Sequence, residues 1–177
     1  VSSEIVALER QVAEAADRLM RIVEKHVHRR LRSLEMVPLL RLVALYLRRT
    51  GFGAIRAVDR GGGDELHLSV EDRRRKGRFR TAVLVRKDSP DKPVPESALA
   101  ALRGALHHYD ASSAMICTTG VFSERARADA AVQNLAPVAL LDGEALAREL
   151  VRLGVGVHAR RVSLPAFDDA FFAALDD

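Results

Sequence analysis

The sequence predicts an α/β fold in which a mixed sheet is flanked by helices and preceded by a long N-terminal helix. After two helix-length segments, three strand-length segments separated only by turns occupy residues 53–85. In the second half, short apolar strands alternate with helix-length segments that begin at capping residues. Strands joined by turns pair antiparallel, whereas strands joined through a helix pair in parallel. Both arrangements in one chain indicate a mixed sheet.

Composition bounds the class of protein. The chain has 177 residues, a net charge of +4, 48% hydrophobic and 29% charged residues, which is typical of one globular domain and unlike a disordered protein. No apolar run reaches the length of a membrane span. The single cysteine, Cys117, excludes an intramolecular disulfide and a cysteine-rich zinc module. The first residues do not resemble a signal peptide, so we expect a cytoplasmic protein.

The first segment, residues 1–35, is expected to be one amphipathic helix, because no Gly or Pro occurs between residues 3 and 34. Its apolar residues alternate steps of three and four, the a/d pattern of a coiled coil. We call this set the heptad seam: Ile5, Leu8, Val12, Ala15, Leu19 and Ile22. The pattern decays at His26 and Arg29. Two interpretations stay open, a helix packed on its own domain and a two-stranded homodimer.

A second helix and three strands follow. Pro38 is compatible with a helix start, and Gly51 is a candidate C′ residue at its end. Strands are predicted over residues 53–58, 65–70 and 79–85, from β-rich composition and period-two alternation.

The remaining chain predicts helices and strands in alternation. A helix is expected over residues 96–109 and a buried strand over 114–118, where Cys117 is a buried residue. Ser123 is an N-cap candidate for a helix to about residue 133, and Asp142 for one that ends at Gly154, after a strand over residues 138–141. The tail, residues 158–177, is acidic and aromatic, and we expect it to dock on its own domain, with a second chain as the alternative.

Three strings in this order resemble the Mrr-type branch of the restriction-endonuclease-like, or PD-(D/E)xK, fold. They are LVALYLRRTGF (residues 42–52), ICTTGVFS (116–123) and LLDGEALA (140–147). The resemblance covers residues 36–157 and leaves the first helix outside. It implies a restriction-endonuclease-like sheet and a function on DNA.

The positions that the resemblance makes catalytic carry unusual residues. Such nucleases bind Mg²⁺ through an acid on the second strand and an acid or Gln on the third, where a Lys follows two residues later. Here His67 stands at the first position, unless a shift of two residues places Glu65 there. Leu84 and Arg86 stand at the other two positions. Leucine cannot bind Mg²⁺, and arginine stays protonated. Asp64, Glu65 and Arg86 are the remaining catalytic candidates, so we expect no cofactor, and Mg²⁺ only if activity persists.

The same resemblance directs the hairpin between the second and third strands toward DNA. The stretch over residues 60–87 has a net charge of +5, and arginines that neutralise phosphates release counterions. The candidate DNA contacts are Arg73, Arg74, Arg75, Lys76, Arg78, Arg80, Arg86, Thr118, Thr119 and Ser123. The two threonines and Ser123 lie near a helix N-terminus, where backbone N–H groups favour phosphate. The alternatives are a solubilising turn for the hairpin, and strand termination and helix capping for the other three.

Three functions follow from these observations. The first is a pseudo-nuclease that binds double-stranded DNA without cutting it, as a homodimer formed by the N-terminal helix. The second is an active Mg²⁺-dependent restriction-type endonuclease. The third is a protein-interaction scaffold, in which the helix and the tail bind a protein partner. No membrane partner is expected.

Overall fold

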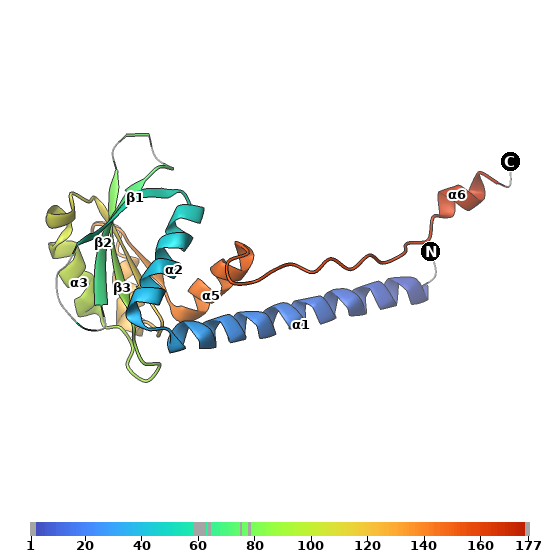
Figure 1. Cartoon of the computed structure of the whole chain (residues 1–177), viewed down its shortest axis with the longest axis horizontal. Coiled ribbons are helices and arrows are strands. Elements are labelled where there is room, and N and C mark those ends of the chain that lie inside the picture. The colour runs from blue at the N-terminus through green and yellow to red at the C-terminus, as the bar shows by residue number, and fades with distance from the viewer. Residues whose placement is uncertain (1–2, 59–62, 64, 75, 78, 176–177) are drawn as a thin grey trace.

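The computed structural model describes residues 3–58, 63, 65–74, 76–77 and 79–175. It contains one sheet, several helices and a short 3₁₀ helix (Figure 1). The elements in chain order are α1 (Ser3–Ser33), α2 (Met36–Arg49), β1 (Phe52–Val58), β2 (Glu65–Asp72), β3 (Arg80–Arg86), α3 (Glu96–Gly104), η1 (Leu106–Tyr109), β4 (Ser113–Thr118), α4 (Glu124–Ala130), β5 (Val138–Leu141), α5 (Gly143–Arg152) and α6 (Asp169–Ala173).

The mixed sheet is confirmed. Its strand order is β1-β2-β3-β4-β5. The first three strands form an antiparallel meander, and β3, β4 and β5 run parallel. The α/β fold predicted from the sequence, with a mixed sheet flanked by helices, is therefore present.

The predicted boundaries hold with two exceptions, the ends of α3 and α4. Gly51 has φ +95° directly after α2, and the side chains of Ser123 and Asp142 accept hydrogen bonds from the backbone N–H groups of Ala126 and Ala145. The expected helix over residues 96–109 is wrong, because α3 ends at Gly104 and the chain tightens into η1.

The break after Gly104 has a packing reason. The tighter 3₁₀ turn places the side chains of Leu106 and Tyr109 in the core, where they are 8% and 3% exposed. Glycine also weakens a helix interior. The helix predicted to residue 133 likewise ends earlier, at Ala130.

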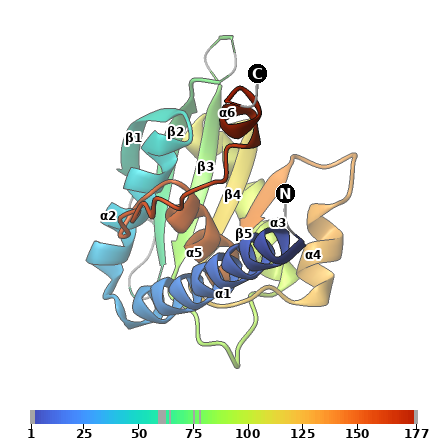
Figure 2. The same cartoon turned by 90° about the vertical axis from the view of Figure 1, so that its right-hand side faces the viewer.

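Helices cover both faces of the sheet (Figure 2). One face packs against α1, α2 and α5 through Val83, Val85 and Cys117, and the other against α3, α4 and η1 through Leu84 and Ile116. Alternate residues of each strand therefore point into different layers. Burial raises the pKa of the Cys117 thiol to about 12, which agrees with its predicted place in a buried strand.

Only the C-terminal third of α1 packs on the body. Leu31 is 1% exposed and Val27 is partly buried in the same cluster. The preceding turns extend away from the sheet (Figure 1), and Leu8, Leu19 and Ile22 are 54%, 62% and 52% exposed. The helix thus packs on its own domain at one end only.

The C-terminal tail does not dock on its own domain, contrary to our expectation. Residues 158–175 are exposed along their length, and Figure 1 shows them leaving the body in the direction of α1. The Phe172 ring contacts Phe167 and Phe171, while each of the three stays more than half exposed. Of the helices that the structure describes, none is long and apolar enough to cross a membrane.

Candidate functional site

The residues at the predicted catalytic positions lie together on the α3 face of the sheet. Glu65 of β2 is in register with Arg86 of β3, and His67 is in register with Leu84. These four side chains and Tyr109 line a cavity of about 260 Å³. Its opposite wall is apolar and comes from α3 and the turn that follows, through Ala98, Ala101, Leu102 and Ala105.

Arg86 occupies the centre of this site and is bound by two carboxylates. Its Nη1 donates to Glu65 Oε2 at 2.9 Å. Its Nε and Nη2 donate to the two carboxylate oxygens of Asp88 at 3.0 and 2.9 Å. The hydrogen bond with Asp88 raises the pKa of the Arg86 guanidinium, against the opposing effect of burial. The guanidinium therefore stays charged, and it pairs with both carboxylates that face it.

Asp88 is fixed in turn by the end of β4. Thr118 Oγ1 donates to Asp88 Oδ2 at 2.8 Å, and the Asp88 backbone N–H donates to Thr119 Oγ1 at 3.0 Å. Both threonines are 1% exposed. Their hydroxyls thus position Asp88 and terminate the strand, so in this conformation they are not presented to a phosphate.

His67 has its own internal partner. Its Nδ1 lies 2.6 Å from the Tyr109 hydroxyl, and its Nε2 lies 3.9 Å from Glu65 Oε1. Sequence analysis did not identify Tyr109, because the contact joins η1 to β2 across 42 residues and no local pattern predicts it.

These side chains do not fit a magnesium ion. Mg²⁺ requires oxygen ligands in octahedral geometry, whereas Leu84 offers none and a guanidinium fills the space between Glu65 and Asp88. Within the described part of the chain, no group of three His, Cys, Asp or Glu side chains could hold a metal. Asp64, the other acid predicted here, lies outside the described residues.

The predicted basic hairpin lies at the far end of β3 from Arg86. Arg80 begins this strand and Arg86 ends it, a separation of roughly 20 Å at the usual rise per residue. The structure therefore does not bring the hairpin and the catalytic positions into one cluster.

The hairpin cations differ in how they are engaged. Arg74 donates twice to the Asp72 carboxylate and stacks on Phe52, and the hydrogen bond with Asp72 raises its pKa. Arg80 donates to the hydroxyl and carbonyl of Ser69. Arg73 and Lys76 are exposed. Arg75 and Arg78 lie outside the described residues.

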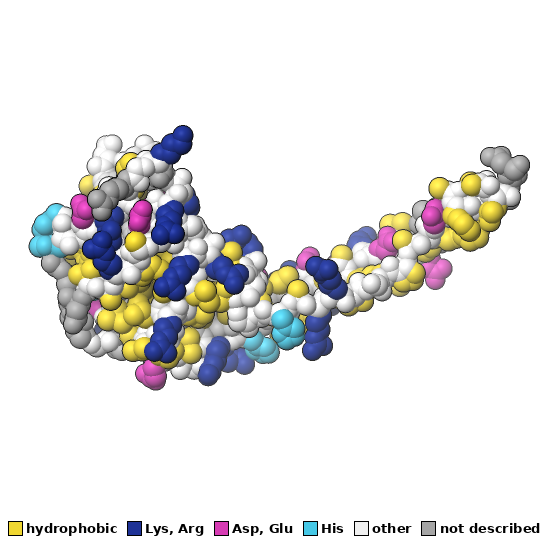
Figure 3. All heavy atoms as spheres, turned by 45° about the horizontal axis from the view of Figure 1, so that its top comes forward, with side chains coloured by type: hydrophobic (Ala, Val, Ile, Leu, Met, Phe, Trp, Pro, Cys, Tyr) yellow, Lys and Arg dark blue, Asp and Glu magenta, His cyan; other side chains and the backbone are white. Residues whose placement is uncertain are grey.

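A basic surface extends from the hairpin to the end of α2. The Arg73 backbone N–H donates to the carbonyl of Gly51 at 3.2 Å, which brings the hairpin beside the exposed Arg48 and Arg49. We call Arg48, Arg49, Arg73 and Lys76 the basic end. Figure 3 shows Lys and Arg side chains spread over the body. Sequence analysis missed the two α2 arginines, although α2 carries no acidic residue.

Ser123 also has an internal role. Its hydroxyl caps α4 by accepting from Ala126, so the capping alternative describes its position in this structure.

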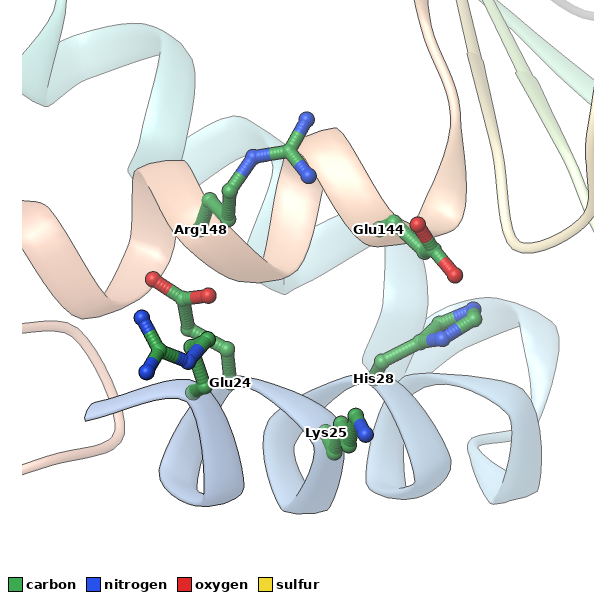
Figure 4. A pocket seen from close by; sticks show the side chains of 6 residues that line it. Glu24, Lys25, His28, Glu144 and Arg148 are labelled. Carbon is green, nitrogen blue, oxygen red and sulfur yellow. The ribbon is translucent and has the colours of Figure 1, made fainter. Parts of the chain in front are cut away.

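A separate groove between α1 and α5 is also charged. It encloses about 180 Å³ and is lined by Arg21, Glu24, Lys25, His28, Glu144 and Arg148. Figure 4 shows Glu24 and His28 of α1 directed toward Arg148 and Glu144 of α5. This groove defines the side of α1 that faces the body.

Comparison with the solved structure of AspBHI supports the restriction-endonuclease-like fold predicted from the sequence. The solved structure of the DNA modification-dependent restriction endonuclease AspBHI has a TM-score of 0.53 and 15% identity, over 78% of this chain and 36% of that chain. The MspJI restriction endonuclease in complex with a 27-mer oligonucleotide gives a TM-score of 0.46 and 23% identity, over 80% and 31% respectively. The chain thus spans about a third of each relative.

Sequence comparison identifies the family. No curated protein matches the sequence. The family model Mrr_cat, described as restriction endonuclease, matches residues 31–150, which is more than half of the chain and includes every position of the site. This chain belongs to the Mrr_cat restriction endonuclease family.

Proposed function

We propose that this protein binds double-stranded DNA as a homodimer paired through α1 and does not cut it. The observation that carries the proposal is the Arg86 guanidinium held between Glu65 and Asp88, at the position that the family resemblance assigns to a catalytic lysine. Because catalytic groups act as a unit, losing two of three should remove most of the activity.

The basic end is the proposed DNA contact. No ion pair engages Arg48, Arg49, Arg73 or Lys76 in the described part of the chain, and these side chains are exposed. Such cations neutralise phosphates without reading bases. Sequence preference should therefore be weak. Arg75 and Arg78 would add to this surface according to the sequence.

The heptad seam supports the homodimer. Leu8, Val12, Leu19 and Ile22 are each about half exposed or more, and an uncovered apolar stripe on a helix is typical of an interaction surface. Two DNA-binding bodies in one dimer would raise the affinity for long DNA by raising the effective concentration of the second contact. We expect this assembly in the cytoplasm.

The test combines binding and cutting in one experiment. The protein is incubated with supercoiled plasmid and Mg²⁺ or Mn²⁺, beside an EDTA control, and resolved on a native gel. We expect a shifted but intact plasmid, with a shift that weakens steeply as salt rises. Nicked or linear product that requires metal would contradict the proposal.

Two other functions make different predictions in the same gel. Metal-dependent cutting would favour an active endonuclease that uses Asp64 and Glu65, and Asp64→Asn with Glu65→Gln should then abolish it. The exposed α1 and tail favour a protein-interaction scaffold, which predicts neither cutting nor a shift.

A further inference from the structure

The two segments that project from the body, α1 and the C-terminal tail, are amphipathic and uncovered. The free part of α1, Ser3 to Ile22, spans about 30 Å at 1.5 Å per residue. The tail runs out in the same direction, and Figure 1 shows α6 beyond the N-terminus of α1. Neither segment has a partner surface within the described chain that would cover its apolar residues. A second copy of the chain can supply one.

We infer that two copies pair their α1 helices antiparallel, and that the acidic tail of each copy docks on the basic residues 25–32 of the other copy's α1. This inference rests on the proposed homodimer and specifies its geometry. The occupant of each exposed face is therefore a second copy of this chain.

The heptad seam is exposed from Leu8 to Ile22 and can receive another helix there, whereas Ile5 is half-buried. The α5 side of α1 is defined by Glu24, His28 and Leu31. At 100° per residue these side chains lie on the opposite side of the helix from Leu19 and Ile22. The exposed His26 and Arg29 continue the seam side. A partner helix on this side would not meet the body that carries it.

The seam is matched to an antiparallel register. When residue 5 of one helix faces residue 22 of the other, Leu8 faces Leu19 and Val12 faces Ala15. Every apolar seam residue then faces another, and the arrangement is symmetric, as a twofold dimer requires.

The charges beside the seam favour the same orientation. Flanking residues set orientation in coiled coils. In the antiparallel register Glu4 faces Lys25 of the second helix, which is attractive. In a parallel pair Glu4 would face Glu9, and two carboxylates would repel.

The tail is complementary to the part of α1 that the partner helix leaves uncovered. Residues 25–32 contain Lys25, Arg29, Arg30 and Arg32 and no acid, whereas residues 164–177 contain four aspartates and no base. In the antiparallel register the first helix ends near residue 24 of the second, so the seam-side His26 and Arg29 lie beyond it.

The length of the tail fits this target. Residues 157–168 can span up to about 40 Å, which exceeds the roughly 30 Å of free α1. The exposed Phe171 and Phe172 would pack beside the stems of the arginines, and Asp168 and Asp169 would pair with their guanidinium groups.

Disulfide cross-linking between chains that each carry one engineered cysteine tests both parts. Cys117 is 1% exposed and, with a pKa raised to about 12, does not compete. We expect Leu8→Cys chains mixed with Leu19→Cys chains to form a linked dimer, and Leu8→Cys chains alone to stay unlinked. We also expect Arg29→Cys chains to link to Ala173→Cys chains. Glu124→Cys on α4 is the control and should give only background with Ala173→Cys.

Each other outcome has a distinct meaning. Linking of Leu8→Cys chains to themselves would establish a parallel pair and overturn the inference while keeping the proposed dimer. A link between positions 8 and 19 without one between 29 and 173 would overturn the placement of the tail. A monomer by light scattering of the unmodified protein would overturn the proposed dimer and the inference together.

Discussion

The two ends of β3 use their cations in different ways. At the C-terminal end, Arg86 is 24% exposed and is hydrogen-bonded to two carboxylates. At the N-terminal end, Arg73 and Lys76 of the hairpin are exposed and no described carboxylate binds them. A cation that already has internal partners stabilises the fold, whereas an exposed one can bind phosphate. The number of arginines in a stretch of sequence therefore does not measure its capacity to bind DNA.

Among substitutions of these cations, we expect the largest effect on the free energy of unfolding at Arg86. Arg86→Leu removes the cation and leaves Asp88, 9% exposed, with an unpaired carboxylate. Removing one partner of a buried pair costs about 3 kcal/mol or more, and the partial exposure of Arg86 favours the lower figure. We expect urea denaturation to show a fall of about 3 kcal/mol in the free energy of unfolding, with little change in DNA affinity.

A compensating variant separates this cause from lost packing. Arg86→Leu with Asp88→Asn removes the unpaired charge and should recover part of the lost stability. Arg56→Leu, at an exposed position of β1, should change stability by less than about 0.5 kcal/mol. A large fall in DNA affinity for Arg86→Leu, at unchanged fold, would show that this arginine contacts DNA after all.

The hairpin should respond in the opposite way. Arg73→Ala with Lys76→Ala removes two exposed cations, so we expect DNA affinity to fall about tenfold at physiological salt and the salt slope to decrease by about two. Fluorescence anisotropy of a labelled duplex over a series of salt concentrations measures both. Thermal unfolding should change little.

Arg80 provides the matched contrast, because it belongs to the same basic run. Its guanidinium donates to Ser69. We therefore expect Arg80→Ala to lower the free energy of unfolding and to change the salt slope of DNA binding little. If the salt dependence of DNA binding were unchanged in the Arg73 and Lys76 double variant, the hairpin would not contact DNA.

The architecture could be predicted from the sequence because its signals are local. Period-two strands, the glycine after α2 and the caps at Ser123 and Asp142 each depend on neighbouring residues. The apolar positions of the two strands predicted that His67, Leu84 and Arg86 lie on adjacent strands, and in the structure His67 is in register with Leu84. The break after Gly104 was missed because it depends on how Leu106 and Tyr109 pack in the core.

The partners of the site could not be predicted, because they are distant in sequence. Asp88 reaches Thr118 across 30 residues, and Tyr109 reaches His67 across 42. From the sequence alone, Thr118 and Thr119 were interpreted as phosphate contacts. In the structure both hydroxyls are buried and hydrogen-bonded to Asp88. The tail was predicted to dock on the body from its composition, and composition does not specify which surface it covers.

The ion pair of Asp142 is intermediate in exposure between the pairs of Arg86 and the exposed cations of the hairpin. It pairs with Arg127, and the side chains of Arg127 and Asp142 are 46% and 17% exposed. Burial acts to raise the pKa of Asp142, but the hydrogen bonds from Arg127 and from the Ala145 backbone N–H outweigh it, and the pKa lies below the ordinary 3.8. The half-exposed pair should contribute little to the free energy of unfolding, so we expect most of the stabilisation by Asp142 to come from capping α5.

We expect Asp142→Ala to lower the free energy of unfolding by about 1 kcal/mol at pH 7, less than Arg86→Leu does. A carboxyl with a lowered pKa stabilises the fold fully above pH 3.8, and this contribution is lost as the pH falls through the folded-state pKa. The stability difference between the unmodified protein and the variant should thus shrink below pH 3.8, measured by urea denaturation at several pH values. Asp142→Asn, which keeps the cap, should lose only a few tenths of a kcal/mol at pH 7. If Asp142→Asn were as destabilising as Asp142→Ala, the pair with Arg127 would contribute more than the cap, and side-chain exposure would not rank the strengths of the ion pairs of this protein.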